Sequence, residues 1–196
     1  QFVKVGSNGV IVSSLDGTSW AVRSSGITTQ LNGVVDGSNG FVAVGASGKI
    51  LLSSDGRSWI EQTSNTVNDL NAVTYANSIY VAVGANGTVV TSSDGTVWTV
   101  QTTPNATDYL TGITYASSGG FVAVGTHAIW QSTNATTWTA QYRANEWFDA
   151  VTFGNGLYVA SGKAMGGLSA IFTSTNGTTW TSQAPGTTNE LYGVTY

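Results

Sequence analysis

The chain contains no cysteine and only one histidine and one methionine among its 196 residues. Without cysteine it can form no disulfide, no thiolate metal site and no thiol nucleophile, and the redox compartment stays open. The single histidine, His127, argues against a histidine-rich metal site and against a histidine-based triad. We interpret His127 as a turn residue that replaces the Ser-Gly or Asn-Gly pair of other segments.

Charge is also scarce. Charged residues make up 8% of the chain and the formal net charge is −4, whereas charged residues are about 25% of typical soluble proteins. No basic patch is present to neutralise phosphates, so we expect no nucleic-acid partner. No apolar run approaches the roughly 20 residues of a membrane helix, and no signal-peptide pattern opens the chain. Ser, Thr, Asn, Gln and Gly supply the polarity, which favours a secreted or cell-surface β-protein without membrane insertion.

What the chain does contain is a repeat. A tryptophan recurs at spacings of 39, 39, 40 and 42 residues, and each copy follows a Ser-x-Asp/Asn-Gly/Ala turn. The residues that define these turns are Asp16, Asp55, Asp94, Asn134 and Asn176, with Trp20, Trp59, Trp98, Trp138 and Trp180. A period near forty residues indicates one supersecondary unit repeated along the chain.

Each repeat contains four short segments rich in Val, Ile, Thr and aromatic residues. In the second repeat they are Leu31–Val35, Phe41–Gly45, Ile50–Ser53 and a segment that starts at Trp59. Glycine, asparagine, serine and aspartate bound these segments and favour tight hairpins. No window has a 3.6-residue apolar period, so we expect no helix. Each repeat therefore predicts a four-stranded antiparallel meander.

A four-stranded sheet repeated radially is a β-propeller blade. We predict an all-β fold, a single five-bladed β-propeller over residues 1–196, with approximate repeats 1–30 plus 191–196, 31–69, 70–109, 110–147 and 148–190. The chain begins on a second strand, Phe2–Gly6, and ends on a first strand, Leu191–Tyr196. Pairing of these two segments would close the ring and remove open sheet edges.

The Ser-x-Asp-Gly-x-x-Trp turn resembles the Asp-box of the bacterial sialidase repeat, which links the third and fourth strands of propeller blades. The five-bladed size is similar in architecture to the tachylectin-type sugar-binding propellers. The resemblance implies a structural role for the ten turn and tryptophan residues, because an Asx side chain caps its own turn and glycine takes positive φ there. One carboxylate per turn falls far short of a calcium site, so we expect no metal and no cofactor.

The sialidase resemblance also invites an enzyme, which would need three convergent arginines. Arg23, Arg57 and Arg143 are the only arginines and occupy non-equivalent repeat positions, at least two of them on opposite faces. No glycine loop that precedes a helix is present to hold phosphates. We therefore expect no sialidase activity, no other glycoside hydrolase activity and no catalytic residues.

A binding site is expected where the repeats differ most, in the linkers between blades. The linker ends would place amides, carboxylates and two aromatic rings around one mouth: Asn68, Asp69, Asp108, Tyr109, Glu146, Trp147, Asn189 and Glu190. Trp147 lies outside the repeat positions, and an exposed aromatic ring beside carboxylates and amides suits sugar recognition. The alternative is that Trp147 packs against a neighbouring blade or plugs the channel. An insertion at 163–168 lies on the same face.

The leading functional prediction is a non-enzymatic carbohydrate-binding or adhesion module whose partner is a glycan or a surface protein. The alternative is an interaction scaffold within a larger extracellular assembly, and photosystem-assembly propellers with related repeats are compatible with such a role. An isolated or designed repeat domain without activity of its own is a further alternative. Four Asn-x-Ser/Thr sequons are present, at Asn86, Asn105, Asn134 and Asn176.

Overall fold

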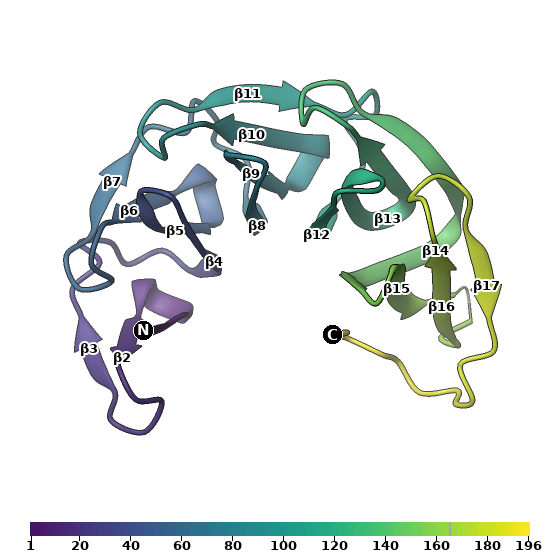
Figure 1. Ribbon diagram of the computed structural model, residues 1–196, viewed down its shortest axis with the longest axis horizontal. Helices are drawn as coiled ribbons and strands as arrows, with labels where there is room; N and C mark the ends of the chain where they lie inside the picture. Colours follow the sequence, from purple (N-terminus) through teal and green to yellow (C-terminus); the bar gives the residue numbers. More distant parts are fainter. Residues whose placement is uncertain (165) are drawn as a thin grey trace. The chain divides into compact units, whose positions relative to one another are not determined.

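The protein is all-β and its sheets are antiparallel, as predicted (Figure 1). The computed structural model describes residues 1–164 and 166–196, except the side chains of residues 143 and 144. The helical elements in the described residues are three short 3-10 turns, η1 (Ser7–Gly9), η2 (Ala46–Gly48) and η3 (Ala85–Gly87). Among those residues, no helix has the length and apolar character needed to cross a bilayer.

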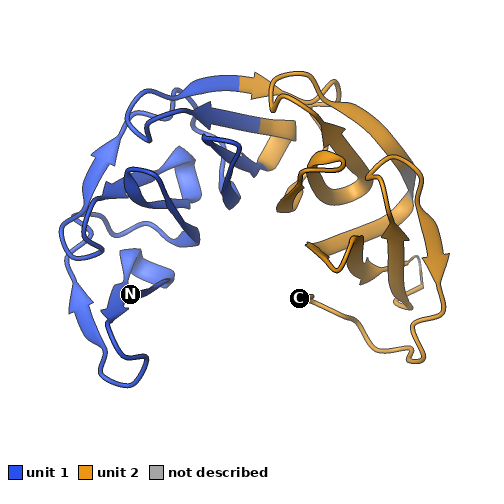
Figure 2. Cartoon of the chain, viewed as in Figure 1, with its two compact units in different colours: residues 1–84, 89–100 blue, residues 85–88, 101–196 orange. Residues whose placement is uncertain are grey.

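The chain divides into two compact units, which are described separately (Figure 2). Unit 1 comprises residues 1–84 and 89–100, and unit 2 comprises residues 85–88 and 101–196.

Unit 1 holds two meanders and most of a third, and in each meander every strand pairs with the next along the chain. The first has three strands, β1 (Phe2–Val5), β2 (Ile11–Ser14) and β3 (Ala21–Arg23). The second has four, β4 (Leu31–Gly37), β5 (Gly40–Gly45), β6 (Ile50–Ser53) and β7 (Ile60–Gln62). The third has four, β8 (Leu70–Ala76), β9 (Ile79–Gly84), β10 (Thr88–Ser92) and β11 (Thr99–Thr102).

Successive meanders of unit 1 pack face to face through apolar side chains. Val42, Val44 and Ile50 of the second meander share a buried cluster with Tyr80 and Trp98 of the third. The Tyr80 hydroxyl donates a hydrogen bond to the Gly40 carbonyl at 3.0 Å. A methyl group at Gly33 would lie 3.5 Å from the Ala72 Cα, an ordinary van der Waals contact, so this position accommodates alanine as well as glycine.

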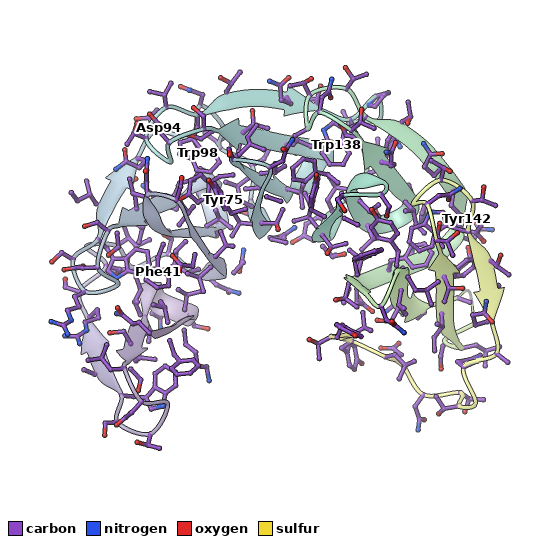
Figure 3. All side chains as sticks on the ribbon, in the orientation of Figure 1. Phe41, Tyr75, Asp94, Trp98, Trp138 and Tyr142 are labelled. Carbon is purple, nitrogen blue, oxygen red and sulfur yellow. The ribbon has the colours of Figure 1, made fainter. Side chains whose placement is uncertain are left out.

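The repeated turn is closed by hydrogen bonds within the turn itself. Asp94 Oδ1 accepts from the backbone N–H groups of Thr96 at 2.8 Å and Val97 at 3.0 Å. The Trp98 indole Nε1 then donates to the Gly95 carbonyl at 2.9 Å (Figure 3). The same backbone bonds are made by the side chains of Asp16, Asp55, Asn134 and Asn176. Burial of the tryptophan differs, since Trp98 is 2% exposed and Trp20 is 43% exposed.

Unit 2 departs from the predicted separate four-stranded sheets. It forms one six-stranded sheet of β12 (Leu110–Ala116), β13 (Gly120–Ser132), β14 (Thr139–Gly154), β15 (Leu157–Lys163), β16 (Ser169–Ser174) and β17 (Thr181–Gln183). The two repeats merge because β14 runs without interruption through the linker 142–147. The linkers 24–30, 63–69 and 183–190 contain a residue with positive φ, namely Gly26, Asn65 and Gly186, whereas the linker 102–109 and the described backbone of 142–147 contain none. The linker 142–147 is the shortest of the five, and its backbone is extended as part of β14.

The pairing of Leu191–Tyr196 with the N-terminal strands is not confirmed. Residues 191–196 are assigned to no strand, and the sheet of β1, β2 and β3 contains three strands. A strand requires a neighbour for its backbone N–H and C=O groups, and this segment has none in the sheet of unit 2. Val194, Thr195 and Tyr196 instead lie beside Gly154 and Leu157. The number of blades is likewise not confirmed.

The turn carboxylates make stability depend on acid. Two backbone N–H bonds to each carboxylate hold the pKa of Asp16, Asp55 and Asp94 below its ordinary range. Because the folded-state pKa lies below the unfolded value of about 3.9, this stabilisation is complete above about pH 5 and is lost as pH falls through the folded-state pKa.

The triple variant D16N/D55N/D94N should therefore lose less stability in acid than the parent chain. Asparagine keeps the accepting oxygen, as Asn134 and Asn176 show, but has no carboxylate to protonate. Thermal unfolding followed by circular dichroism between about pH 5 and pH 2 measures the difference. Parallel declines of Tm in the two proteins would contradict the prediction.

Candidate functional site

A pocket of about 490 Å³ lies in unit 2, where the sequence departs most from the repeat. We call it the Trp147 pocket; its lining residues are His127, Asn145, Trp147, Lys163, Ala164, Gly166, Gly167 and Glu190. Strand β13 supplies His127, β14 supplies Asn145 and Trp147, β15 supplies Lys163, and the loop that follows β15 supplies Ala164 and the two glycines. Glu190 comes from the segment after β17.

An irregular pairing of β13 with β14 builds one wall of the pocket. Thr126 pairs with Trp147 and Ala128 pairs with Arg143, so residues 144–146 bulge opposite the single residue His127. His127 has a φ of 64°, the conformation that Asn8, Ser47 and Asn86 adopt in the corresponding turns. The Trp147 indole Nε1 donates a hydrogen bond to His127 Nε2 at 3.1 Å. The bulge thus leaves Trp147 47% exposed at the end of this wall.

Lys163 and Glu190 form the charged part of the pocket. The Lys163 ammonium lies 5.0 Å from the centre of the Trp147 ring and 3.5 Å from Glu190 Oε1. The Tyr192 hydroxyl donates to Glu190 Oε2 at 2.6 Å. This bond, helped by Lys163, lowers the pKa of Glu190, so the carboxylate is ionised at neutral pH. Lys163 stands where corresponding turns have the small residues Ala46 and Ala85.

Asp149, on β14, is near enough to Lys163 and Glu190 for the charges to interact. At the corresponding positions the Asn32 amide donates to the Leu70 carbonyl at 2.9 Å, and the Thr111 hydroxyl donates to the Phe148 carbonyl at 2.7 Å. An ionised aspartate has no proton to donate, and Asp149 Oδ2 is buried without a hydrogen-bond partner. Burial raises the pKa of Asp149, the charge of Glu190 adds to the rise, and the charge of Lys163 opposes it.

Trp147 and Glu190 are the two residues of the sequence-predicted set that line this pocket. Glu146 does not line it, and its hydrogen bond to Tyr142 adds to the burial that raises the pKa of that phenol. Tyr109 is 43% exposed and pairs through its backbone with Thr126, while the Asn189 carbonyl accepts from the Ser169 hydroxyl at 2.6 Å.

Asp108 is a buried structural residue. It is 3% exposed, Oδ2 accepts from the Trp130 indole at 2.7 Å, and Oδ1 accepts from the Asn105 amide at 2.5 Å. Its carboxylate holds the linker onto β13 and is turned away from solvent, which removes it from the set of residues that a ligand can reach.

In unit 1, Asn68 lines an open hollow of about 810 Å³ together with Lys49 and Glu61. Asp69 joins its linker to the η2 turn, since its Oδ1 accepts from the Ser47 backbone N–H at 2.8 Å, 22 positions earlier in the chain.

Two of the three arginines lie close together. Arg23 and Arg57 line a common cavity of about 240 Å³ in unit 1. The side chain of Arg143 lies outside the described part of the chain.

His127 and Asn145 were not predicted as pocket residues, and Lys163 was noted only as the first residue of the insertion 163–168. Two features of the sequence could have indicated this pocket, the short linker before Trp147 and the insertion after Gly162. Met165 of that insertion lies outside the described residues. Within the described chain, no three His, Cys, Asp or Glu residues gather in a way that could hold a metal ion.

Comparison with known proteins identifies the fold and no family. No protein-family model matches the chain, and no curated protein sequence matches it. Membership of the Asp-box repeat family is therefore not confirmed.

Solved structures do match. A streptogramin B lyase is similar with a TM-score of 0.72 and 18% identity, over 97% of this chain and 70% of the lyase. YCF48 bound to D1 peptide is similar with a TM-score of 0.67 and 18% identity, over 93% of this chain and 63% of YCF48. An ancestral GH74 enzyme is similar with a TM-score of 0.68 and 14% identity, over 93% of this chain and 31% of the enzyme. These likenesses support a β-propeller fold.

The prediction that the chain is not an enzyme was wrong, because the fold does not exclude enzymatic activity. Two of these similar structures are enzymes, a streptogramin B lyase and an ancestral GH74 enzyme, so this architecture accommodates catalysis. At 14–18% identity the likeness concerns the fold and assigns no activity to this chain.

Removing Asp108 should cost stability. The variant D108A leaves the buried Trp130 indole N–H without this acceptor, and the loss of a charged, buried hydrogen bond costs about 1.5–3 kcal/mol of the free energy of unfolding. Urea denaturation of D108A and of the parent measures the difference. A free energy of unfolding equal to that of the parent would contradict the structural role of Asp108.

Proposed function

We propose that the chain binds a carbohydrate in the Trp147 pocket, as a recognition module at a cell surface or in a secreted protein. The observation that carries the proposal is a half-exposed tryptophan ring set beside a carboxylate, an amide and an imidazole in one cavity. A pyranose ring presents apolar C–H groups on its face and hydroxyl groups around its rim. Such a ligand needs a flat apolar surface and directed polar groups together.

Each lining group has a matching task. The Trp147 ring offers the stacking surface, and its orientation is held by the hydrogen bond to His127. Glu190, already ionised and fixed by Tyr192, accepts from sugar hydroxyl groups. Asn145 is exposed and carries both a donor and an acceptor. Gly166 and Gly167 line the cavity without side chains of their own.

Glycan binding should depend on Trp147 and not on tryptophan exposure in general. Trp20 is the matched control, because it is 43% exposed against 47% for Trp147 and belongs to a repeat turn. On a glycan array, W147A should lose at least about tenfold in affinity for the glycan that the parent retains, the equivalent of 1.4 kcal/mol. W20A should bind like the parent. Equal binding by W147A and the parent would overturn the assignment of the site.

A second candidate function is the docking of a peptide. Leu168 follows Lys163 in the chain and Tyr192 follows Glu190, and both side chains are exposed. The similar YCF48 structure is described as bound to a D1 peptide. A peptide library displayed on phage and selected against the parent chain tests this candidate. Peptide binding would be favoured over sugar binding if peptides enriched on the parent chain do not bind W147A and the parent binds no glycan on the array.

For the fold, we propose five Asp-box blades closed into a ring by the segment 191–196 and β1. The register of β4 with β5 pairs Val35 with Val42, and the corresponding residues are Thr195 and Val3. The chain has no cysteine, so the double variant V3C/T195C reports on this pairing alone.

Oxidation of V3C/T195C should give a fast-migrating, intramolecularly cross-linked monomer on non-reducing electrophoresis, because paired strands bring Cα atoms within disulfide range. The double variant V5C/T195C, shifted along the strand, is the control and should cross-link poorly. Equal cross-linking of the two, or disulfide-linked dimers only, would refute closure within one chain.

A further inference from the structure

The Lys163 ammonium occupies a position that suits a bound cation. It lies over the Trp147 ring at 5.0 Å and contacts the Glu190 carboxylate at 3.5 Å. An aromatic face beside a carboxylate attracts ammonium groups, since the negative face of the ring and the anion act in the same direction. Lys163 itself is partly exposed, with 29% of its side chain accessible, so its ammonium group can move out into solvent.

The charges around this position favour a positive group. Glu190 lines the pocket and Asp149 lies close enough for its charge to interact with both Lys163 and Glu190. Asp149 also has a buried oxygen without a hydrogen-bond partner. Two carboxyl groups thus lie near one lysine, and both would repel an anionic ligand in the same place.

We propose that Lys163 is a tethered occupant of the pocket and that the ligand is an amino sugar with a free amine, whose ammonium group displaces the Lys163 ammonium. The inference rests on the proposed carbohydrate function and names its substrate class. The sugar face stacks on Trp147, and the ammonium substituent takes over the contact with Glu190. The Lys163 side chain then swings toward solvent, which its long flexible stem and partial exposure allow.

A self-occupied site has a distinctive consequence. Removing the lysine raises the affinity for a cationic ligand, because the ligand no longer competes with a tethered cation at high effective concentration. Removing the same lysine lowers the affinity for an anionic ligand, which would have used Lys163 as its partner. The sign of the effect of one substitution therefore separates the two ligand classes.

The test is isothermal titration calorimetry with the parent, K163M, E190Q and K49M. The ligands are a fully deacetylated glucosamine hexamer, its fully N-acetylated form and a galacturonate hexamer, at a pH at which the free amine is protonated. Lys49 supplies the matched control, since it is also ion-paired, to Glu61, and its side chain is 32% exposed.

We expect the deacetylated hexamer to bind the parent more tightly than the acetylated one. K163M should tighten its binding at least threefold, E190Q should weaken it at least tenfold, and K49M should change nothing. Weaker binding of the deacetylated hexamer to K163M overturns the inference. So does galacturonate binding that is lost in K163M.

The outcomes also separate this inference from the proposed function. Binding of the acetylated hexamer that depends on Trp147, with no preference for the free amine and no effect of K163M, overturns the amino-sugar assignment and leaves carbohydrate binding intact. Absence of binding for all three hexamers and for the glycan array overturns both.

Discussion

The rest of the structure depends on one repeated interaction, the hydrogen bonds that an Asp or Asn side chain accepts from backbone N–H groups in the turn after each third strand. One side-chain oxygen accepts two backbone N–H groups and fixes the turn, as Asp94 does. The indoles of Trp20, Trp98, Trp138 and Trp180 donate to the turn's own carbonyl, whereas Trp59 Nε1 is buried without a hydrogen-bond partner. The turn is therefore held mainly by its own residues, with one added bond from a neighbouring meander, in which the Asn39 amide donates to the Asp94 carbonyl at 3.1 Å. Because it also sets the direction of the tryptophan, each sheet presents a large apolar ring at the same point, and Trp98 and Trp138 become buried there.

A scaffold held by local, repeated turns tolerates change elsewhere. The fourth and fifth repeats keep the turn through Asn134 and Asn176 but differ in the linker, in the turn at His127 and after Gly162. These changes coincide in space. The continuous strand β14 carries the bulge that exposes Trp147, and the end of β15 brings Lys163 over its ring. The repeat supplies stability, and departures from it supply a cavity that combines the aromatic face of Trp147 with the charged groups of Lys163 and Glu190.

The predictable part of the fold was the part determined by short-range chemistry. Turn residues, strand segments such as Phe41–Gly45 and the small residue at Gly33 follow from local sequence, and the structure contains them. The merging of two repeats through β14 accompanies a linker between Tyr142 and Trp147 that is shorter than the others, a weak signal in a single sequence. Of the site, Trp147 and Glu190 were predicted from their linker positions. His127 and Lys163 were not, because their contacts join residues 20 and 27 positions apart in the chain, which only the fold brings together.

The central claim is that the repeat tryptophans hold the scaffold and Trp147 meets the ligand. The chain has seven tryptophans, and each indole N–H gives its own signal in a ¹H–¹⁵N correlation spectrum. Titration with the glucosamine hexamer, after assignment by single substitution, tests the claim most directly. The account predicts that the Trp147 signal shifts with ligand while those of Trp20, Trp59, Trp98, Trp138 and Trp180 stay in place. Shifts at the repeat tryptophans with an unmoved Trp147 signal would contradict it.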